Sequence, residues 1–300
     1  MAAAANQARV QTLNEASLPF LVWVQSMRSE PLDHLMRALS WIGREEFYLL
    51  LVPIVYWCHS ARGGLLAGYG LLLGSYAGEL VKWSFKLPRP LASQLTILWP
   101  ETSPGFVSTH ASASAGFWGG LALALRSRVV VVTAVVMVLG IGFSRLYLGS
   151  HWPADVVGGW VLGLLAALAA PAAVSALERL HSRPAPERFL WPVVLSAAAF
   201  LLFPGQGPGE WPAAPAATHA GVFLGFTLGH LSLAPSEAPV RPWLRYSAGI
   251  AVVLAVYLGM KVSSPGQDYF LEQLLRFFRY AVLGFCISGL MPRMFRRLGI

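Results

Sequence analysis

The segment Ser-Arg-Leu-Tyr-Leu-Gly-Ser-His-Trp-Pro-Ala-Asp, residues 144–155, joins two long apolar segments, 129–147 and 154–175. Each of these is long enough to cross the hydrocarbon core of a bilayer as a helix. Ionisable side chains at membrane depth are costly and usually functional, so His151 and Asp155 are candidates for chemistry. The segment therefore predicts both a helical membrane fold and the place of an active site.

The composition of the whole chain also indicates a membrane protein. Hydrophobic residues make up 56% of the 300 residues and charged residues 12%, whereas a soluble domain has about a quarter charged residues. The first residues lack the pattern of a secretory signal, so we expect the helices themselves to direct insertion. We predict an all-α polytopic helical bundle of about nine transmembrane helices, at 47–59, 64–81, 109–125, 129–147, 154–175, 189–203, 213–233, 246–262 and 270–290.

We expect three parts with different roles. Residues 1–46 have apolar residues at helical spacing with charges between them, which is typical of interfacial helices. Residues 47–175 form the catalytic core, and residues 189–300 form a four-helix membrane block of unknown role. Arg-rich short connections predict that the C-terminus is cytoplasmic and that the 144–155 segment lies on the outer face. The Ala- and Gly-rich composition favours a bacterial inner membrane.

Two features that suggest other functions have simpler explanations. The net charge of +8 comes without a basic stripe or a base-stacking module, so we expect no nucleic-acid partner. Cys58 and Cys286 both lie within apolar segments and lack metal-ligand spacing, which is typical of inert buried thiols.

Two further polar clusters lie at the ends of spans on the same predicted side as residues 144–155. One contains Lys82 and Arg89, and the other is the segment 108–110. Lys82, Arg89 and Arg145 together supply three cations with many donors, which suits a dianionic phosphate. Ser108 can cap the span that begins at residue 109, so that the backbone N–H groups of 108–110 point at an anion.

The remaining residues of these clusters suit nucleophilic catalysis. Pro153 is expected in the first helical turn of the following span, so Asp155 can reach back to His151. A carboxylate that accepts from one imidazole nitrogen leaves the other nitrogen free as a nucleophile. His110 is available to protonate the leaving oxygen. The set predicts phosphoryl transfer through a phosphohistidine, without a required metal.

These residues also form three recognisable motifs. The patterns Lys82-x6-Arg89-Pro90, Ser108-x-His110 and Ser144-Arg145-x5-His151-x3-Asp155 resemble the signature motifs of the type 2 phosphatidic acid phosphatase superfamily, over about residues 80–160. The resemblance implies a helical core, no cofactor, His151 as nucleophile and His110 as acid. It implies phosphate binding by Lys82, Arg89, Ser108, Thr109 and Arg145.

One position departs from the family pattern. The middle motif usually reads Pro-Ser-Gly-His, whereas residues 107–110 read Val-Ser-Thr-His. Loss of Gly changes how closely the backbone can approach a phosphate. We therefore expect an altered substrate shape at Thr109, with activity retained.

The sequence predicts a membrane-embedded phosphatase that hydrolyses a lipid phosphate or a lipid pyrophosphate, such as a polyprenyl pyrophosphate. Its expected partners are the lipid substrate and membrane lipids. The alternatives are a lipid phosphotransferase with the same intermediate, a sugar-phosphate phosphatase and a non-catalytic lipid transporter or binding protein. The sequence leaves open whether the chain forms a homo-oligomer.

Overall fold

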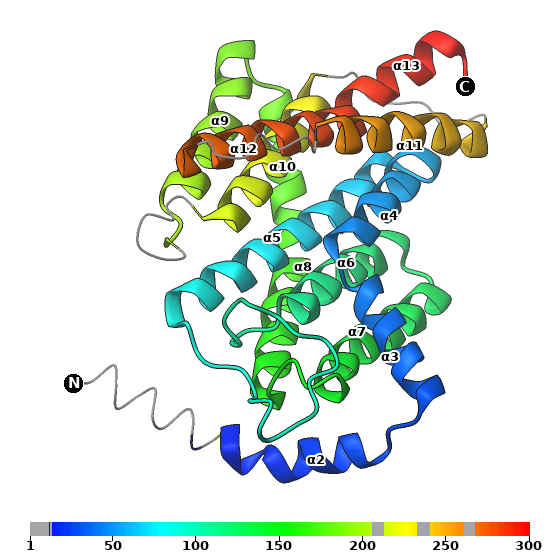
Figure 1. The fold of residues 1–300 in the computed structure, drawn as a ribbon. Coiled ribbons are helices and arrows are strands. Elements are labelled where there is room, and N and C mark those ends of the chain that lie inside the picture. The colour runs from blue at the N-terminus through cyan, green and yellow to red at the C-terminus, as the bar shows by residue number, and fades with distance from the viewer. Residues whose placement is uncertain (1–11, 13, 206–212, 233–240, 261–267) are drawn as a thin grey trace. The chain divides into compact units, whose positions relative to one another are not determined.

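A computed structural model describes residues 12, 14–205, 213–232, 241–260 and 268–300. These residues form helices and loops and include no strand. The start of the predicted 1–46 region and the ends of the predicted spans 213–233 and 246–262 lie outside them. The helices are α2 (Leu18–Ser26), α3 (Glu30–Ile42), α4 (Glu45–Cys58), α5 (Ala61–Phe85), α6 (Thr109–Leu125), α7 (Arg128–Tyr147), α8 (Pro153–His181), α9 (Ala185–Leu201), α10 (Ala214–Leu231), α11 (Pro242–Gly259), α12 (Tyr269–Phe285) and α13 (Met291–Leu298), with a π-helical turn at Cys286–Leu290 before α13 (Figure 1).

A helix lies at each of the nine predicted spans, but a helix at such a position does not by itself cross the membrane. Among the described residues, five helical segments are long and apolar enough to cross a membrane: Ala61–Phe85, Arg128–Tyr147, Pro153–His181, Pro242–Gly259 and Tyr269–Leu298. In contrast, α4 has only 14 residues and contains Pro53. A helix rises 1.5 Å per residue, so α4 is shorter than a hydrocarbon core of about 30 Å. The all-helical membrane fold is confirmed, and the count of nine crossings stays a prediction.

The chain forms two compact units. Residues 1–48 and 69–169 make the first unit, and residues 49–68 and 170–300 make the second. All three motifs belong to the first unit. The division by role into 1–46, 47–175 and 189–300 stays a prediction.

Small residues bring three helices of the first unit close together. A Cβ atom on Gly70 of α5 would meet the backbone carbonyl of Gly116 of α6, and the reverse also holds. On α8, a Cβ on Gly159 would lie 2.8 Å from the Cβ of Ala111. Such positions let helix backbones approach closely in a membrane. The packing places the beginning of α6 beside the first turns of α8.

Replacing Gly116 with alanine should therefore lower the stability of the first unit. The added Cβ would lie 2.8 Å from the carbonyl carbon of Gly70, and overpacking of this kind costs about 1–3 kcal/mol. Gly140 of α7 is the matched control, because its added Cβ would meet only Leu39 methyl groups, at 3.6 Å. Thermal unfolding in detergent should show a lower midpoint for Gly116→Ala than for Gly140→Ala. Equal midpoints would show that α5 and α6 are not packed this closely.

Apolar side chains cover the outward faces of α7 and α8 in the first unit. They recur at helical spacing, so that each helix has one apolar stripe that the rest of the first unit leaves uncovered. Surfaces of this kind are suited to contact with lipid tails. The residues are Val129, Val132, Val136 and Leu139 on α7, and Val157, Val161, Leu164 and Leu168 on α8.

In the second unit, a stripe of glycines holds α10 against α12 and the π-helical turn. Cβ atoms on Gly221 and Gly225 would overlap backbone atoms of Phe277 and Ala281. Gly229, one turn further on, meets Ser288 and Gly289 in the same way, a spacing typical of close helix pairs in membranes. The second unit thus has a tightly packed core of its own.

Candidate active site

The site residues lie in two loops of the first unit and at the ends of the helices that these loops join. The loop 86–108 joins α5 to α6, and the loop 148–152 joins α7 to α8. The hydroxyl of Ser150 donates to the carbonyl of Trp99 at 2.8 Å, which fixes the second loop to the first. Residues far apart in the sequence are thereby held in one place.

His151 forms a buried pair with Asp155. Nδ1 of His151 lies 3.1 Å from Oδ2 of Asp155, and each side chain is 1% exposed. The chain begins α8 at Pro153, so Asp155 is in the first helical turn, and its Oδ2 also accepts from the Trp152 backbone N–H at 3.0 Å. Because Oδ2 accepts from the Trp152 N–H, it faces His151 as an acceptor too, so Nδ1 carries the proton and Nε2 has the lone pair.

Arg89 lies directly against that lone pair. Its Nη1 is 2.9 Å from Nε2 of His151 and donates to the carbonyl of Ser150 at 2.6 Å. Its Nε and Nη2 donate to the carbonyl and the hydroxyl of Ser103, at 2.6 and 3.0 Å. A guanidinium cannot accept a hydrogen bond, so this contact requires the same tautomer of His151. Four hydrogen bonds thus fix Arg89 at Nε2 of His151.

Lys82, near the end of α5, is buried at 2% exposure. Its Nζ donates to the hydroxyl of Thr109 at 3.0 Å and to Oε1 of Glu79 at 3.2 Å. The hydroxyl at 109 is present because this chain has Thr where the family pattern has Gly. The departure from the pattern therefore gives Lys82 a partner at the start of α6.

Arg145, near the end of α7, has no exposed surface. Its Nη1 donates to the hydroxyl of Ser40 of α3, and its Nη2 donates to Oε1 of Glu101 at 2.7 Å. The centroid of the Trp99 ring lies 5.7 Å from the guanidinium carbon. In the part of the chain that the structure describes, the Nε of Arg145 has no hydrogen-bond partner.

Among the described residues of the three motifs, two more buried polar atoms have no hydrogen-bond partner, namely Oγ of Ser108 and Nε2 of His110. Ser108 is the N-cap residue of α6, but its side chain makes no capping hydrogen bond, so the prediction of a side-chain cap is wrong. The Ser108 N–H is also occupied, because it donates to the backbone carbonyl of Asp155 at 2.9 Å. The amides that remain for an anion begin at Thr109. Buried donors without a protein partner indicate a polar ligand.

Burial and the neighbouring cations favour the neutral form of His151. Burial lowers the pKa of His151 well below 6.5, and the positive charges of Arg89, Arg145 and Lys82 lower it further. A charged His110 acts in the same direction, so all three motifs lie within electrostatic range of His151. A neutral imidazole is the form that can attack phosphorus.

Four residues that contact the site were not predicted from the sequence: Ser40, Glu101, Ser103 and Ser150. Only Glu101 could have been noticed in the sequence, because it is the only acidic residue between Lys82 and His110. The other three are serines, which occur too often to stand out. The described residues contain no group of three or more His, Cys, Asp or Glu side chains that could hold a metal.

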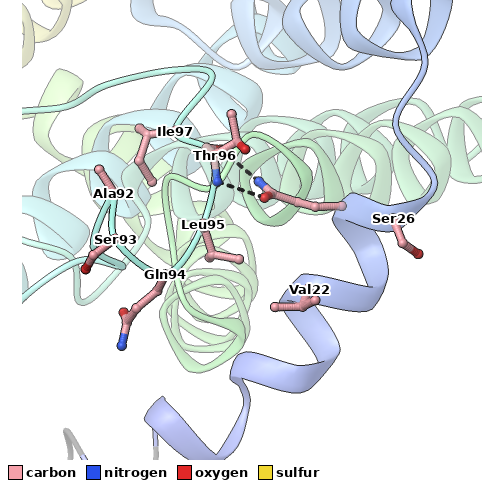
Figure 2. A pocket seen from close by; sticks show the side chains of 9 residues that line it. Val22, Ser26, Ala92, Ser93, Gln94, Leu95, Thr96 and Ile97 are labelled. Carbon is pink, nitrogen blue, oxygen red and sulfur yellow. Dashed lines mark hydrogen bonds between the residues drawn. The ribbon is translucent and has the colours of Figure 1, made fainter.

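An open groove of about 710 Å³ lies next to these loops, between α2 and residues 92–97 (Figure 2). Gln25 of α2 crosses it, with its amide bonded to both the N–H and the carbonyl of Thr96 at 3.0 and 2.8 Å. The same Nε2 lies 3.1 Å from the carbonyl of Tyr147. Gln25, which lines the groove, thus also contacts the end of α7, just before the loop that carries His151.

Fold and site together define a helical membrane protein with a buried histidine–carboxylate pair among three cations. Comparisons with known proteins give the family. The profile of the PAP2 superfamily matches residues 63–179, and that of the PAP2 superfamily phosphatase transmembrane extension matches residues 215–300. The chain belongs to the type 2 phosphatidic acid phosphatase (PAP2) superfamily. No solved structure matches the chain.

Several curated proteins are similar to this chain. A probable sphingosine-1-phosphate phosphatase of Dictyostelium discoideum is 29% identical over 72% of this chain and 57% of its own length. Sphingosine-1-phosphate phosphatase 2 of Mus musculus is 24% identical over 89% of this chain and 88% of its own. An undecaprenyl-diphosphatase of Sulfolobus acidocaldarius is 28% identical over 44% of this chain and 66% of its own. The chain thus spans little more than half of the Dictyostelium relative.

Proposed function

We propose that this chain is a membrane enzyme that hydrolyses a lipid phosphate or lipid pyrophosphate through a phosphohistidine at His151. The observation that carries the proposal is the neutral, oriented imidazole of His151, whose Nε2 faces the guanidinium of Arg89 at 2.9 Å. The named activities of the relatives, on a sphingoid-base phosphate and on a prenyl diphosphate, support the same substrate class.

In the first half of the reaction, a phosphate oxygen takes the place of Nε2 as acceptor for Arg89. The lone pair of Nε2 then forms a bond to phosphorus, and the ester P–O bond breaks. His110 donates its proton to the departing oxygen, so the lipid leaves as an alcohol from a phosphate ester or as a lipid monophosphate from a pyrophosphate. Asp155 stabilises the positive charge that forms on the ring of His151.

In the second half, His110 accepts a proton from water while the water oxygen bonds to phosphorus. The P–N bond breaks, its electron pair returns to Nε2, and inorganic phosphate leaves. Lys82, Arg89, Arg145 and the Thr109 amide hold the phosphate oxygens throughout. Fixed donors of this kind stabilise the charge that develops in the transition state. No metal or other cofactor is assigned a step.

We further propose that the chain crosses the membrane nine times, with the site on the outer face of a bacterial inner membrane. The site residues lie at the end of α5, the beginning of α6, the end of α7 and the beginning of α8. Four successive crossings would bring these ends to one face. The Arg-rich connections on the opposite side support the orientation.

Phosphate release by the purified protein in detergent tests the proposed activity. The substrates would be phosphatidic acid, phosphatidylglycerol phosphate, sphingosine 1-phosphate, a polyprenyl pyrophosphate and a sugar phosphate, each with wild type and His151→Ala. Release from at least one lipid by wild type alone is expected. Transfer of phosphate to an added alcohol in preference to water would identify a phosphotransferase, and no turnover of any substrate would favour a binding protein.

Phosphate release should continue at acidic pH. Because burial and nearby cations hold the pKa of His151 well below 6.5, the imidazole loses its nucleophilic lone pair only below that pH. The acidic limb of kcat/KM should therefore lie below pH 6.5 in a profile measured from about pH 4 to about pH 8. The second ionisation of the substrate phosphate has a pKa of about 6, so it must be measured by ³¹P NMR in the same micelles. A limb at or above pH 6.5 after this correction would contradict a buried, cation-flanked His151.

A further inference from the structure

Glu101 introduces a negative charge where the proposed function requires a phosphate to bind. Its Oε1 accepts from Nη2 of Arg145 at 2.7 Å. Its side chain is 24% exposed, whereas Arg145 is fully buried. The charge of Glu101 also acts on Arg89, where it raises the pKa against the larger lowering by burial. Glu101 is thus an acidic residue among the cations of the site, and its side chain is partly exposed.

The geometry of Arg145 puts this carboxylate next to the phosphate. The Nε and Nη2 donors belong to one planar guanidinium fork, which usually binds an anion through both atoms. Glu101 occupies Nη2, while Nε has no partner among the residues that the structure describes. A phosphate oxygen bound at Nε would therefore lie beside the carboxylate of Glu101, where like charges repel.

The charges around the site are already balanced before a substrate arrives. Two cations are in direct contact with carboxylates, Lys82 with Glu79 and Arg145 with Glu101, and the third, Arg89, contacts His151, which is itself paired with Asp155. A dianionic phosphate alone would leave this buried cluster with an excess of negative charge. A substrate that carries its own cation close to the phosphate would reduce that excess.

We propose that Glu101 is a specificity residue that binds an ammonium group next to the phosphate, so that the preferred substrates are phosphorylated amino-alcohol lipids. This inference rests on the proposed lipid phosphatase function. An ammonium on the carbon next to the phosphate-bearing carbon is close enough to reach a carboxylate that shares a guanidinium with the phosphate. A role in orienting Arg145 alone would not need a charge, because Ser40 already binds Nη1 of that guanidinium with a neutral hydroxyl.

A matched pair of substrates tests the charge directly. Sphingosine 1-phosphate has a free ammonium, and its N-acetyl derivative has the same phosphate and chain but a neutral amide. Wild type should hydrolyse the amine-bearing lipid with a higher kcat/KM. Glu101→Gln, which keeps the shape and a hydrogen-bond acceptor, should lose about tenfold or more on the amine-bearing lipid and little or nothing on the N-acetyl lipid. Glu46→Gln, which removes a carboxylate from a surface pair with Arg44, is the matched control and should not change the ratio.

The outcomes separate the two proposals. An equal loss on both lipids in Glu101→Gln would show that Glu101 only orients Arg145, and a wild-type preference for the N-acetyl lipid would also overturn the inference. Hydrolysis of phosphatidic acid or polyprenyl pyrophosphate, but of neither sphingoid lipid, would leave the phosphatase function intact and reject the substrate class. No hydrolysis of any lipid phosphate by wild type would reject the proposed function itself.

Discussion

Replacing His151 with alanine should lower the rate of phosphate release about 10⁴- to 10⁶-fold, because the group that bonds to phosphorus is removed. The fold should persist, because Asp155 keeps its hydrogen bond from the Trp152 N–H and Arg89 keeps those to Ser103 and Ser150. The measurement is release of ³²P from labelled lipid, with thermal unfolding recorded on the same preparation. His34→Ala is the matched control, since His34 is an exposed histidine of α3 in the same compact unit.

The covalent step can be tested by trapping the intermediate. Wild type quenched in alkali during turnover should carry ³²P on protein, because a phosphoramidate bond to histidine survives alkali and breaks in acid. His151→Ala should carry none. His110→Ala should still form the bond with a substrate whose leaving group needs no proton, and should release it slowly, because His110 activates the water. Label on His151→Ala equal to that on wild type would place the nucleophile elsewhere.

The sequence predicted the parts of this molecule that depend on local pattern. The expected span 109–125 coincides with α6 because a polar N-cap precedes a continuous run of small and apolar residues. The pairing of His151 with Asp155 follows from Pro153, which begins α8 and puts the carboxylate within reach. Both predictions needed only residues within one or two turns of each other.

The parts that could not be predicted depend on contacts across the fold. Ser40 is 105 positions from Arg145, and Glu101 is 44 positions away, so neither spacing has a periodicity that a sequence reveals. The failure of Ser108 to cap α6 has the same origin. The carbonyl of Asp155, on another helix, occupies the Ser108 backbone N–H and leaves its hydroxyl buried within the site. Helical pattern alone does not distinguish that arrangement from an ordinary cap.

Asp155→Ala should produce the second large loss of activity, about 10³- to 10⁴-fold in kcat, as in enzymes whose catalytic imidazole loses its orienting carboxylate. Without Oδ2, the Nδ1–H of His151 and the N–H of Trp152 both lose their acceptor. The imidazole is then free to take the tautomer with its proton on Nε2, which cannot attack phosphorus. The loss should appear in kcat measured with saturating lipid, while the labelled intermediate forms correspondingly slowly.

Asp155→Asn should lower kcat less than Asp155→Ala does, because an asparagine can keep the orientation of His151. An asparagine amide can present either oxygen or nitrogen to His151, and in other histidine–carboxylate pairs the wrong choice destroys the tautomer. Here the Trp152 N–H can only donate, and it points at the same atom that accepts from His151, at 3.0 Å. The amide oxygen must therefore occupy that position, so the tautomer is kept and only the negative charge is lost. Equal losses in Asp155→Ala and Asp155→Asn would mean that the charge of Asp155, and not the orientation of His151, accounts for its whole effect.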